Sequence, residues 1–240
     1  MSDRITWLTQ DLADLPCSLT WLGPSERARL DQLRVAKRRC DFLLGRWTAK
    51  RAIAAVLGAL APPAAAIELR AAPDGAPEAF VDGAPLPLVV SISHSAGRGL
   101  AALRPGGASL GADLEHVEPR TTLLVEDFFT AGEAARVAAC DPAERDRLIT
   151  LFWSAKESAL KALRLGLRED PRHIDVAVGD AGAAHDATGA WHPLQVTASA
   201  ERPPLAGWWR SDETFIFTLV GEPPIALPEA VIALAPRHAG

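Results

Sequence analysis

With 240 residues, 48% of them hydrophobic, the chain is long enough for one large domain or two modest ones around a buried core. A net charge of -5 argues against a surface built as a whole to hold nucleic acid or anionic lipid, so any anion site must be local. The three cysteines form no Cys-x-x-Cys pair, which favours free thiols in the cytoplasm over a disulfide framework or a zinc site. With no signal-peptide core and no apolar run of about 18 residues, we expect a soluble, unexported chain.

The first half of the sequence predicts a long helix followed by short strands. Residues 25–60 are rich in Ala, Leu and Arg and run up to two prolines, which indicates one long helix or two abutting ones. Strands are predicted at 67–70, 88–92, 99–103 and 109–115, separated by turns rich in proline and glycine.

The second half repeats this order. Helices are predicted at 131–139 and 142–165, and strands at 174–178, 194–198, 207–210 and 214–220. We identify no residue-by-residue repeat, so two related halves and two unrelated α+β halves both stay open. Two halves suggest a site between them. Residues 223–240, rich in Ala and Pro, are expected to be a tail that is either laid on the surface or frayed.

An acid pair stands in the strand predicted at 109–115. Side chains two apart on a strand point to the same face, so Asp113 and Glu115 would lie side by side. Two adjacent carboxylates repel unless a cation separates them, and a hard divalent ion such as Mg²⁺ is the usual one. Solvated acids on an exposed edge strand are the alternative.

The predicted helix at 142–165 has an apolar face and a charged one. Its buried stripe is formed by apolar residues at helical spacing, namely Leu148, Phe152, Ala155, Ala159 and Leu163. Glu157 and Lys161, four residues apart, share another face. They form either a surface ion pair worth about 0.3–0.5 kcal/mol or a site in which Glu157 ligates a metal and Lys161 holds a phosphate oxygen.

A third segment, Ser91-Ile92-Ser93-His94-Ser95, ends a strand and precedes a turn at Gly97. Hydroxyls, an imidazole and the N–H groups of a turn can cradle a phosphate, although a structural histidine in an ordinary serine turn is the alternative. The chain has neither a Gly-x-x-x-x-Gly-Lys loop nor a Gly-x-Gly-x-x-Gly motif, which disfavours a P-loop or Rossmann nucleotide site.

In order and spacing, these segments resemble the Sfp-type 4′-phosphopantetheinyl transferases. The resemblance runs from about Arg34 to Val178 and includes Phe128-Phe129 through Glu133. It implies an α+β fold of two similar α/β halves related by a pseudo-two-fold axis, each a long helix packed on a small, mostly antiparallel sheet, with the active site at their interface. Residues 1–108 would grip the nucleotide of coenzyme A, and residues 109–240 would carry the metal-binding acids and the catalytic helix.

The activity implied by the resemblance is transfer of the 4′-phosphopantetheine arm of coenzyme A to a serine of an apo acyl or peptidyl carrier protein, with release of 3′,5′-ADP. The reaction would depend on Mg²⁺, with Mn²⁺ as a possible substitute, in a cytoplasmic monomer that binds neither nucleic acid nor membrane. Two alternatives are a catalytically silent homologue that binds carrier protein, and a Mg²⁺-dependent pyrophosphatase acting on coenzyme A or a nucleotide.

By the same resemblance, Asp113, Glu115 and Glu157 would bind the metal. Glu157 is also a candidate general base for the carrier serine, although a bound cation lowers the pKa of a carboxylate and weakens it as a base. Lys161 would contact the diphosphate. An acid at Glu133 recurs in the family, but Thr130-Ala131-Gly132-Glu133 is also a capping box, the reading we favour.

Coenzyme A itself would be held by Lys37, Gly75, Ser93, His94 and Lys161. Lys37 belongs to a basic stretch, residues 26–51, which contains nine basic residues and three acidic ones. The turn at Gly75 departs from the family, because Ala76 stands where many relatives carry a lysine that reaches a coenzyme A phosphate. Either another cation replaces it, with Arg70 and Arg98 as candidates, or binding is weaker by about 1.5–3 kcal/mol.

Overall fold

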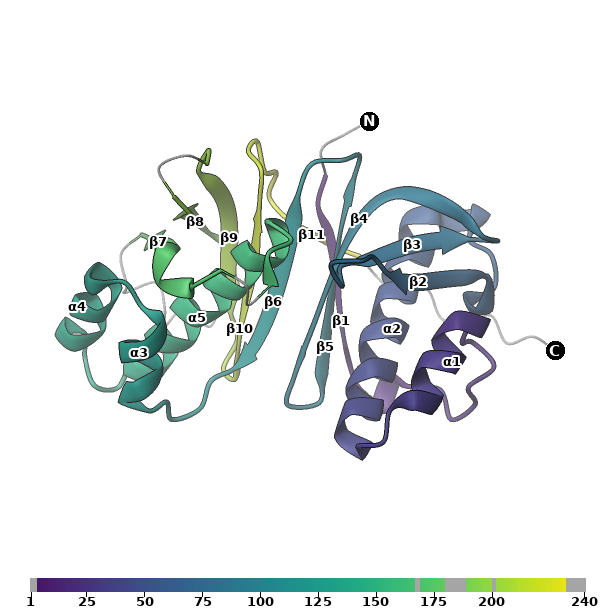
Figure 1. Ribbon diagram of the computed structural model, residues 1–240, viewed down its shortest axis with the longest axis horizontal. Helices are drawn as coiled ribbons and strands as arrows, with labels where there is room; N and C mark the ends of the chain where they lie inside the picture. Colours follow the sequence, from purple (N-terminus) through teal and green to yellow (C-terminus); the bar gives the residue numbers. More distant parts are fainter. Residues whose placement is uncertain (1–3, 167–168, 180–188, 200–201, 232–240) are drawn as a thin grey trace.

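The computed structural model describes residues 4–166, 169–179, 189–199 and 202–231. Its described residues form a mixed α+β fold of two halves, each with a long helix packed on a mostly antiparallel sheet (Figure 1). The two sheets face each other near the middle of the molecule, with α1 and α2 belonging to one half and α3, α4 and α5 to the other. No helix in these ranges is long and apolar enough to cross a membrane.

The first sheet has the strand order β11-β1-β5-β4-β3-β2. All neighbours are antiparallel except β1 and β11. Its strands are β1 (Thr6–Asp11), β2 (Ile67–Ala71), β3 (Pro77–Val81), β4 (Ala84–Ser95), β5 (Arg98–Pro105) and β11 (Glu229–Ala230). It is covered by α2 (Ala36–Leu57), which follows α1 (Pro24–Gln32). The predicted helical region is therefore two helices.

The second sheet has the order β6-β10-β9-β8-β7 and is antiparallel throughout. Its strands are β6 (Leu110–His116), β7 (Asp175–Val178), β8 (His192–Thr197), β9 (Leu205–Ser211) and β10 (Phe215–Gly221). The helices of this half are α3 (Thr122–Phe128), α4 (Ala131–Ala139) and α5 (Arg145–Ala162). Short 3-10 turns lie at Leu12–Asp14, Gly58–Leu60, Ala64–Ala66 and Pro171–His173.

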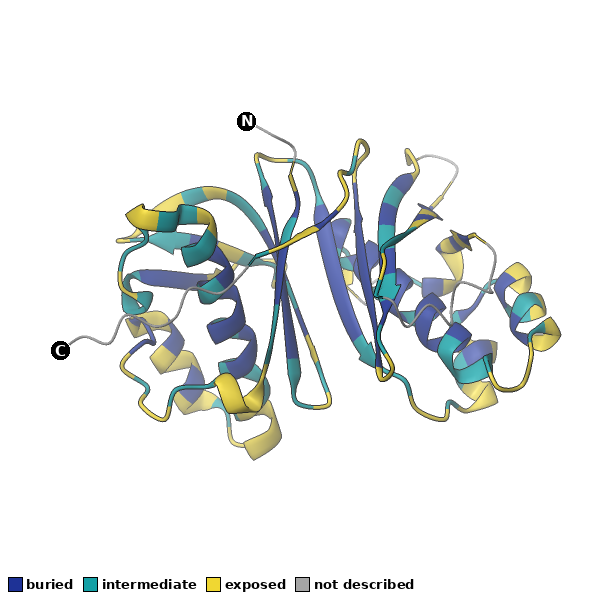
Figure 2. Cartoon of the chain, turned by 180° about the vertical axis from the view of Figure 1, so that it is seen from behind, coloured by how far each residue is buried: buried dark blue, intermediate teal, exposed yellow. Residues whose placement is uncertain are grey.

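Strand alternation explains how β5 serves two cores. Leu100 and Ala102 join a buried cluster with residues of β6 and β10, whereas Ala101 and Leu103 face α2. The cluster between the sheets therefore joins the two halves, and the buried residues concentrate on the central strands and on the helix faces turned toward them (Figure 2).

A buried ion pair recurs in both halves. Lys50 of α2 pairs with Glu26, and Lys156 of α5 pairs with Glu133, all four side chains being almost fully buried. Each lysine also donates to backbone carbonyls, so the buried charges are satisfied by hydrogen bonds.

The two glutamates are bound in the same way. Glu26 accepts hydrogen bonds from the N–H of Gly23 at 2.9 Å and of Leu69 at 3.2 Å. Glu133 accepts from the N–H of Thr130 at 2.8 Å and of Val176 at 2.9 Å. Each glutamate thus ties the start of a short helix to the strand that follows the long one. The capping box expected at Glu133 is confirmed.

Aromatic pairs repeat with the ion pairs. Trp21 and Trp47 have ring centroids 5.1 Å apart, and Phe128 and Trp153 have the same separation. The segments Trp-Thr-Ala-Lys, ending at Lys50, and Trp-Ser-Ala-Lys, ending at Lys156, therefore occupy equivalent places. This is the residue-level repeat that we did not identify from the sequence.

Several elements were not predicted. Strands β1 and β3 and helix α3 lie outside the predicted segments, and part of the region expected to be a tail forms β11, which pairs with β1 in the first sheet. Residues 109–240 therefore do not all belong to the second sheet. The remainder of the expected tail, residues 232–240, lies outside the described residues.

Candidate active site

Helix α5 lies unusually close to β6. A Cβ atom built on Gly111 would stand 1.8 Å from the carbonyl oxygen of Ser158 and 2.6 Å from the amide nitrogen of Ala162. Only glycine permits this approach, because both obstacles are backbone atoms. The contact brings the strand that carries Asp113 against the helix that carries Lys161.

Asp113 lies at the point where β4, β6 and α5 meet. It is 3% exposed. Its Oδ1 accepts from Ser93 Oγ and Lys161 Nζ, both at 2.7 Å, and its Oδ2 accepts from Ser154 Oγ at 2.8 Å. Burial opposes ionisation, yet the charge of Lys161 and the hydrogen bonds from all three donors outweigh it and lower the pKa of Asp113. The carboxylate is therefore charged and fully engaged. Ser154 was not singled out from the sequence.

The carboxylates of Glu115 and Glu157 have fewer hydrogen-bond donors around them than that of Asp113. Burial and the charge of Asp113 raise the pKa of Glu115, although Arg120 donates to its Oε2 at 3.1 Å. Burial and the charges of Asp113 and Glu115 also raise the pKa of Glu157. Among the described residues, Glu157 makes no hydrogen bond or ion pair. The three acids therefore repel one another across this junction.

The three carboxylates of Asp113, Glu115 and Glu157 suit a hard divalent cation. Carboxylate oxygens are the preferred ligands of Mg²⁺, and a cation would relieve the repulsion between the acids. In the arrangement seen here, however, the ammonium of Lys161 takes one oxygen of Asp113. Within the described ranges, no three Asp, Glu, His or Cys side chains are grouped closely enough to hold a metal. The expected convergence of all three acids on one point is thus not present in this structure.

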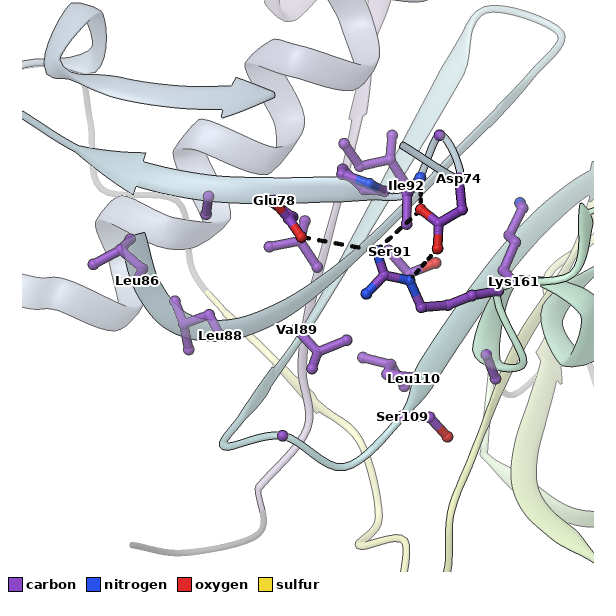
Figure 3. A pocket seen from close by; sticks show the side chains of 18 of the residues that line it. Asp74, Glu78, Leu86, Leu88, Val89, Ser91, Ile92, Ser109, Leu110 and Lys161 are labelled. Atoms are coloured by element: carbon purple, nitrogen blue, oxygen red, sulfur yellow. Dashed lines mark hydrogen bonds and ion pairs between the residues drawn. The ribbon is translucent and has the colours of Figure 1, made fainter. Parts of the chain in front are cut away.

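Two hollows flank the junction. One, of about 600 Å³, lies between β3, β4 and the end of α5 and is lined mainly by apolar side chains, with Lys161 on its helical wall (Figure 3). The other, of about 340 Å³, lies over α2 and is lined by Arg29, Arg38 and Arg46 together with His94. Gly75 and Pro77 border both hollows.

The residues predicted to hold coenzyme A are distributed over these features. His94 faces the basic hollow, where burial lowers its pKa against the opposing charge of Asp41. Gly75 borders both hollows, and Ser93 donates to Asp113. Lys37 is 79% exposed and pairs with Asp41 at 2.8 Å without lining either hollow.

The two cations suggested as substitutes for the lysine absent at Ala76 lie elsewhere. Arg70 pairs with Glu68 at 2.7 Å, and Arg98 pairs with Asp212 at 2.7 Å. Neither lines either of the two hollows described above. The guanidinium that does reach this turn belongs to Arg164, which pairs with Asp74 at 2.6 Å and which the sequence did not indicate.

Comparison with known families bears directly on this site. Residues 109–204 match the model of the 4′-phosphopantetheinyl transferase superfamily, a segment that contains β6, α5 and all three acids. No curated protein matches the chain significantly. The match reaches the superfamily, so the Sfp-type assignment stays a prediction. Over this segment, which is less than half of the chain, the protein is similar to the 4′-phosphopantetheinyl transferase superfamily.

Proposed function

We propose that this protein transfers the 4′-phosphopantetheine arm of coenzyme A to a serine of an acyl or peptidyl carrier protein, as a Mg²⁺-dependent cytoplasmic monomer. The observation that carries the proposal is the environment of Asp113. Ser93 of β4 and Ser154 and Lys161 of α5 all donate to this one buried carboxylate of β6. Residue types typical of the family's three motifs thus meet at one point between the halves.

The two hollows fit the two ends of coenzyme A. The basic hollow, with three arginines and His94, suits the phosphates of the nucleotide end. The larger hollow is mostly apolar and suits the pantetheine arm. Lys161 stands on the wall of the larger hollow beside Asp113, in a position to hold a diphosphate oxygen between the two.

Asp113, Glu115 and Glu157 are the residues that would hold Mg²⁺. The ion would supply positive charge against the diphosphate and the departing 3′,5′-ADP. Lys161 now neutralises Asp113 and would be released to bind a phosphate oxygen.

In the reaction, the carrier serine Oγ attacks the β-phosphorus of coenzyme A. The new Oγ–P bond forms as the bond from that phosphorus to the bridging oxygen breaks, and 3′,5′-ADP leaves with the electron pair. Glu157, which has no hydrogen-bond partner among the described residues, is our candidate to take the serine proton. Positioning and charge stabilisation supply most of the acceleration.

The test mixes the protein with an apo carrier protein, coenzyme A and Mg²⁺ and reads the carrier by mass spectrometry. We expect a phosphopantetheine adduct and stoichiometric 3′,5′-ADP, both lost when EDTA is added. Release of 3′,5′-ADP without any carrier would identify a pyrophosphatase instead. A complex with the carrier whose mass never changes would identify a silent binding protein.

A further inference from the structure

The turn between β2 and β3 forms a wall shared by the two hollows, through Gly75 and the adjoining Pro77. Its internal hydrogen bonds are local. Ala72 N donates to Ala76 O and Gly75 N to Ala72 O, both at 2.8 Å, while Asp74 Oδ1 accepts from Ala76 N at 3.1 Å. These bonds fix the shape of the turn, but they do not fix its distance from α5 across the larger hollow.

Arg164 crosses that distance from the opposite half. Its Nε lies 2.6 Å from Asp74 Oδ2, and a terminal nitrogen of its guanidinium lies 3.0 Å from Asp74 Oδ1 and 3.8 Å from Glu78. In Figure 3, dashed lines mark the ion pairs that reach both Asp74 and Glu78, and Asp74 lies between Glu78 and Lys161. The hydrogen bond with Asp74 raises the pKa of Arg164 and lowers that of Asp74.

The backbone conformation of Arg164 is unfavourable for an arginine, which indicates that its side chain contributes something a glycine could not. Its φ is +57°, in the left-handed region that favours glycine. In the first half, Gly58 stands eight residues after the buried Lys50, as Arg164 does after Lys156, and has φ +60°. One half thus ends its long helix with the unstrained residue, while the other keeps an arginine that binds Asp74.

We infer that Arg164 is a positioning residue: its clasp on Asp74 holds the 72–76 turn at a fixed distance from the end of α5, and so sets the shape of the groove that receives coenzyme A. The inference rests on the proposed function for the identity of the ligand. Because the clasp acts on the wall rather than on the ligand, removing either Arg164 or Asp74 should weaken the binding of coenzyme A.

The experiment measures the dissociation constant of coenzyme A by calorimetry, and KM and kcat in the carrier assay. We expect Arg164→Ala and Asp74→Ala each to raise the dissociation constant and KM about three- to fivefold, the scale of a partly exposed ion pair, with kcat within about twofold. The double variant, Arg164→Ala with Asp74→Ala, should bind coenzyme A no more than about twofold more weakly than the weaker single variant, because both changes break the same ion pair. Arg172→Ala is the matched control, since it removes an exposed arginine paired with Asp170 at 2.6 Å, away from both hollows.

The outcomes separate the two proposals. A protein that binds coenzyme A but never modifies a carrier contradicts the proposed function and leaves the clasp measurable through binding. An unchanged dissociation constant in Arg164→Ala overturns the clasp, as does a protein that does not bind coenzyme A. If Asp74→Ala tightens binding while Arg164→Ala weakens it, Arg164 contacts the ligand itself and positioning is wrong.

Discussion

Helices α2 and α5 occupy equivalent places in the two halves, and each carries a buried lysine held by a glutamate from a preceding short helix. The next residue differs, because Arg51 follows Lys50 whereas Glu157 follows Lys156. Five residues after the lysine, the first half has Ala55 and the second has Lys161. The lysine and glutamate are therefore framework common to both halves, and the residues that we propose for the chemistry stand at positions where the halves diverge.

The divergence also gives the two halves different charges around the proposed site. The first half lines its hollow with arginines, whereas the second carries three acids that interact electrostatically with one another and with Lys161, without converging on one point. Cations on one side and acids on the other suit a ligand with phosphates and a divalent ion bridging them. A repeated fold can therefore supply two complementary electrostatic surfaces for one substrate.

Replacing the residue that follows each buried lysine should give the largest difference in kcat between the two halves. Glu157→Gln should lower kcat about a thousandfold if the carboxylate takes the serine proton and holds the metal. Arg51→Gln, the equivalent change in the first half, should leave kcat within about twofold and is the control for a general disturbance of the helix. Full turnover in Glu157→Gln, measured by carrier mass, would remove this residue from the mechanism.

Removing the buried lysine should destabilise the protein by the same amount in either half. Lys50→Met and Lys156→Met each leave a buried carboxylate without its partner, so each should lower the free energy of unfolding by about 3–5 kcal/mol. Urea denaturation followed by circular dichroism measures both. If Lys156→Met abolished transfer while leaving the unfolding free energy unchanged, Lys156 would belong to the active site rather than to the framework.

The fit of each long helix on its sheet should differ between the halves. Gly111→Ala should lower the free energy of unfolding by about 3 kcal/mol, because its new methyl group meets backbone atoms of α5. In Gly99→Ala, under α2, the three atoms nearest to the new methyl group belong to the side chains of Leu44 and Thr48, so this change should lower the free energy of unfolding by about 1 kcal/mol. Gly111→Ala should also lose turnover at a temperature where it stays folded. Equal costs in the two variants would show that α5 adjusts as easily as α2.

The periodic parts of the fold were predictable from the sequence. The apolar stripe of α5 and the cap of α4 are local signals, and both elements appear close to their predicted bounds. β11 was not predictable, because it has two residues and exists only through its pairing with β1. The repeat was missed because its clearest trace is four residues long, Trp-Thr/Ser-Ala-Lys, and becomes evident only when both lysines are seen buried against equivalent glutamates.

For the site, the sequence indicated which segments lie near one another but not which side chains contact one another. Asp113 and Lys161 do meet, but across 48 residues and through the close approach at Gly111, which no local pattern encodes. The prediction assigned Lys161 to a phosphate, whereas here it neutralises Asp113. Side-chain pairing of this kind depends on tertiary packing, so the sequence could indicate the residue types but not their partners.

The smallest expected effects are changes in the KM for coenzyme A when individual basic residues of the first half are removed. Arg46 lines the basic hollow, and its Nε is buried without a hydrogen-bond partner in the described structure, as a donor awaiting an anion would be. Arg46→Ala should raise the KM for coenzyme A about tenfold, the loss of one charge-assisted hydrogen bond. Lys37→Ala should raise it less than about twofold, because Lys37 is exposed and already paired with Asp41. A larger effect at Lys37 than at Arg46 would mean that coenzyme A binds the exposed lysine, and that the first half changes conformation around its ligand.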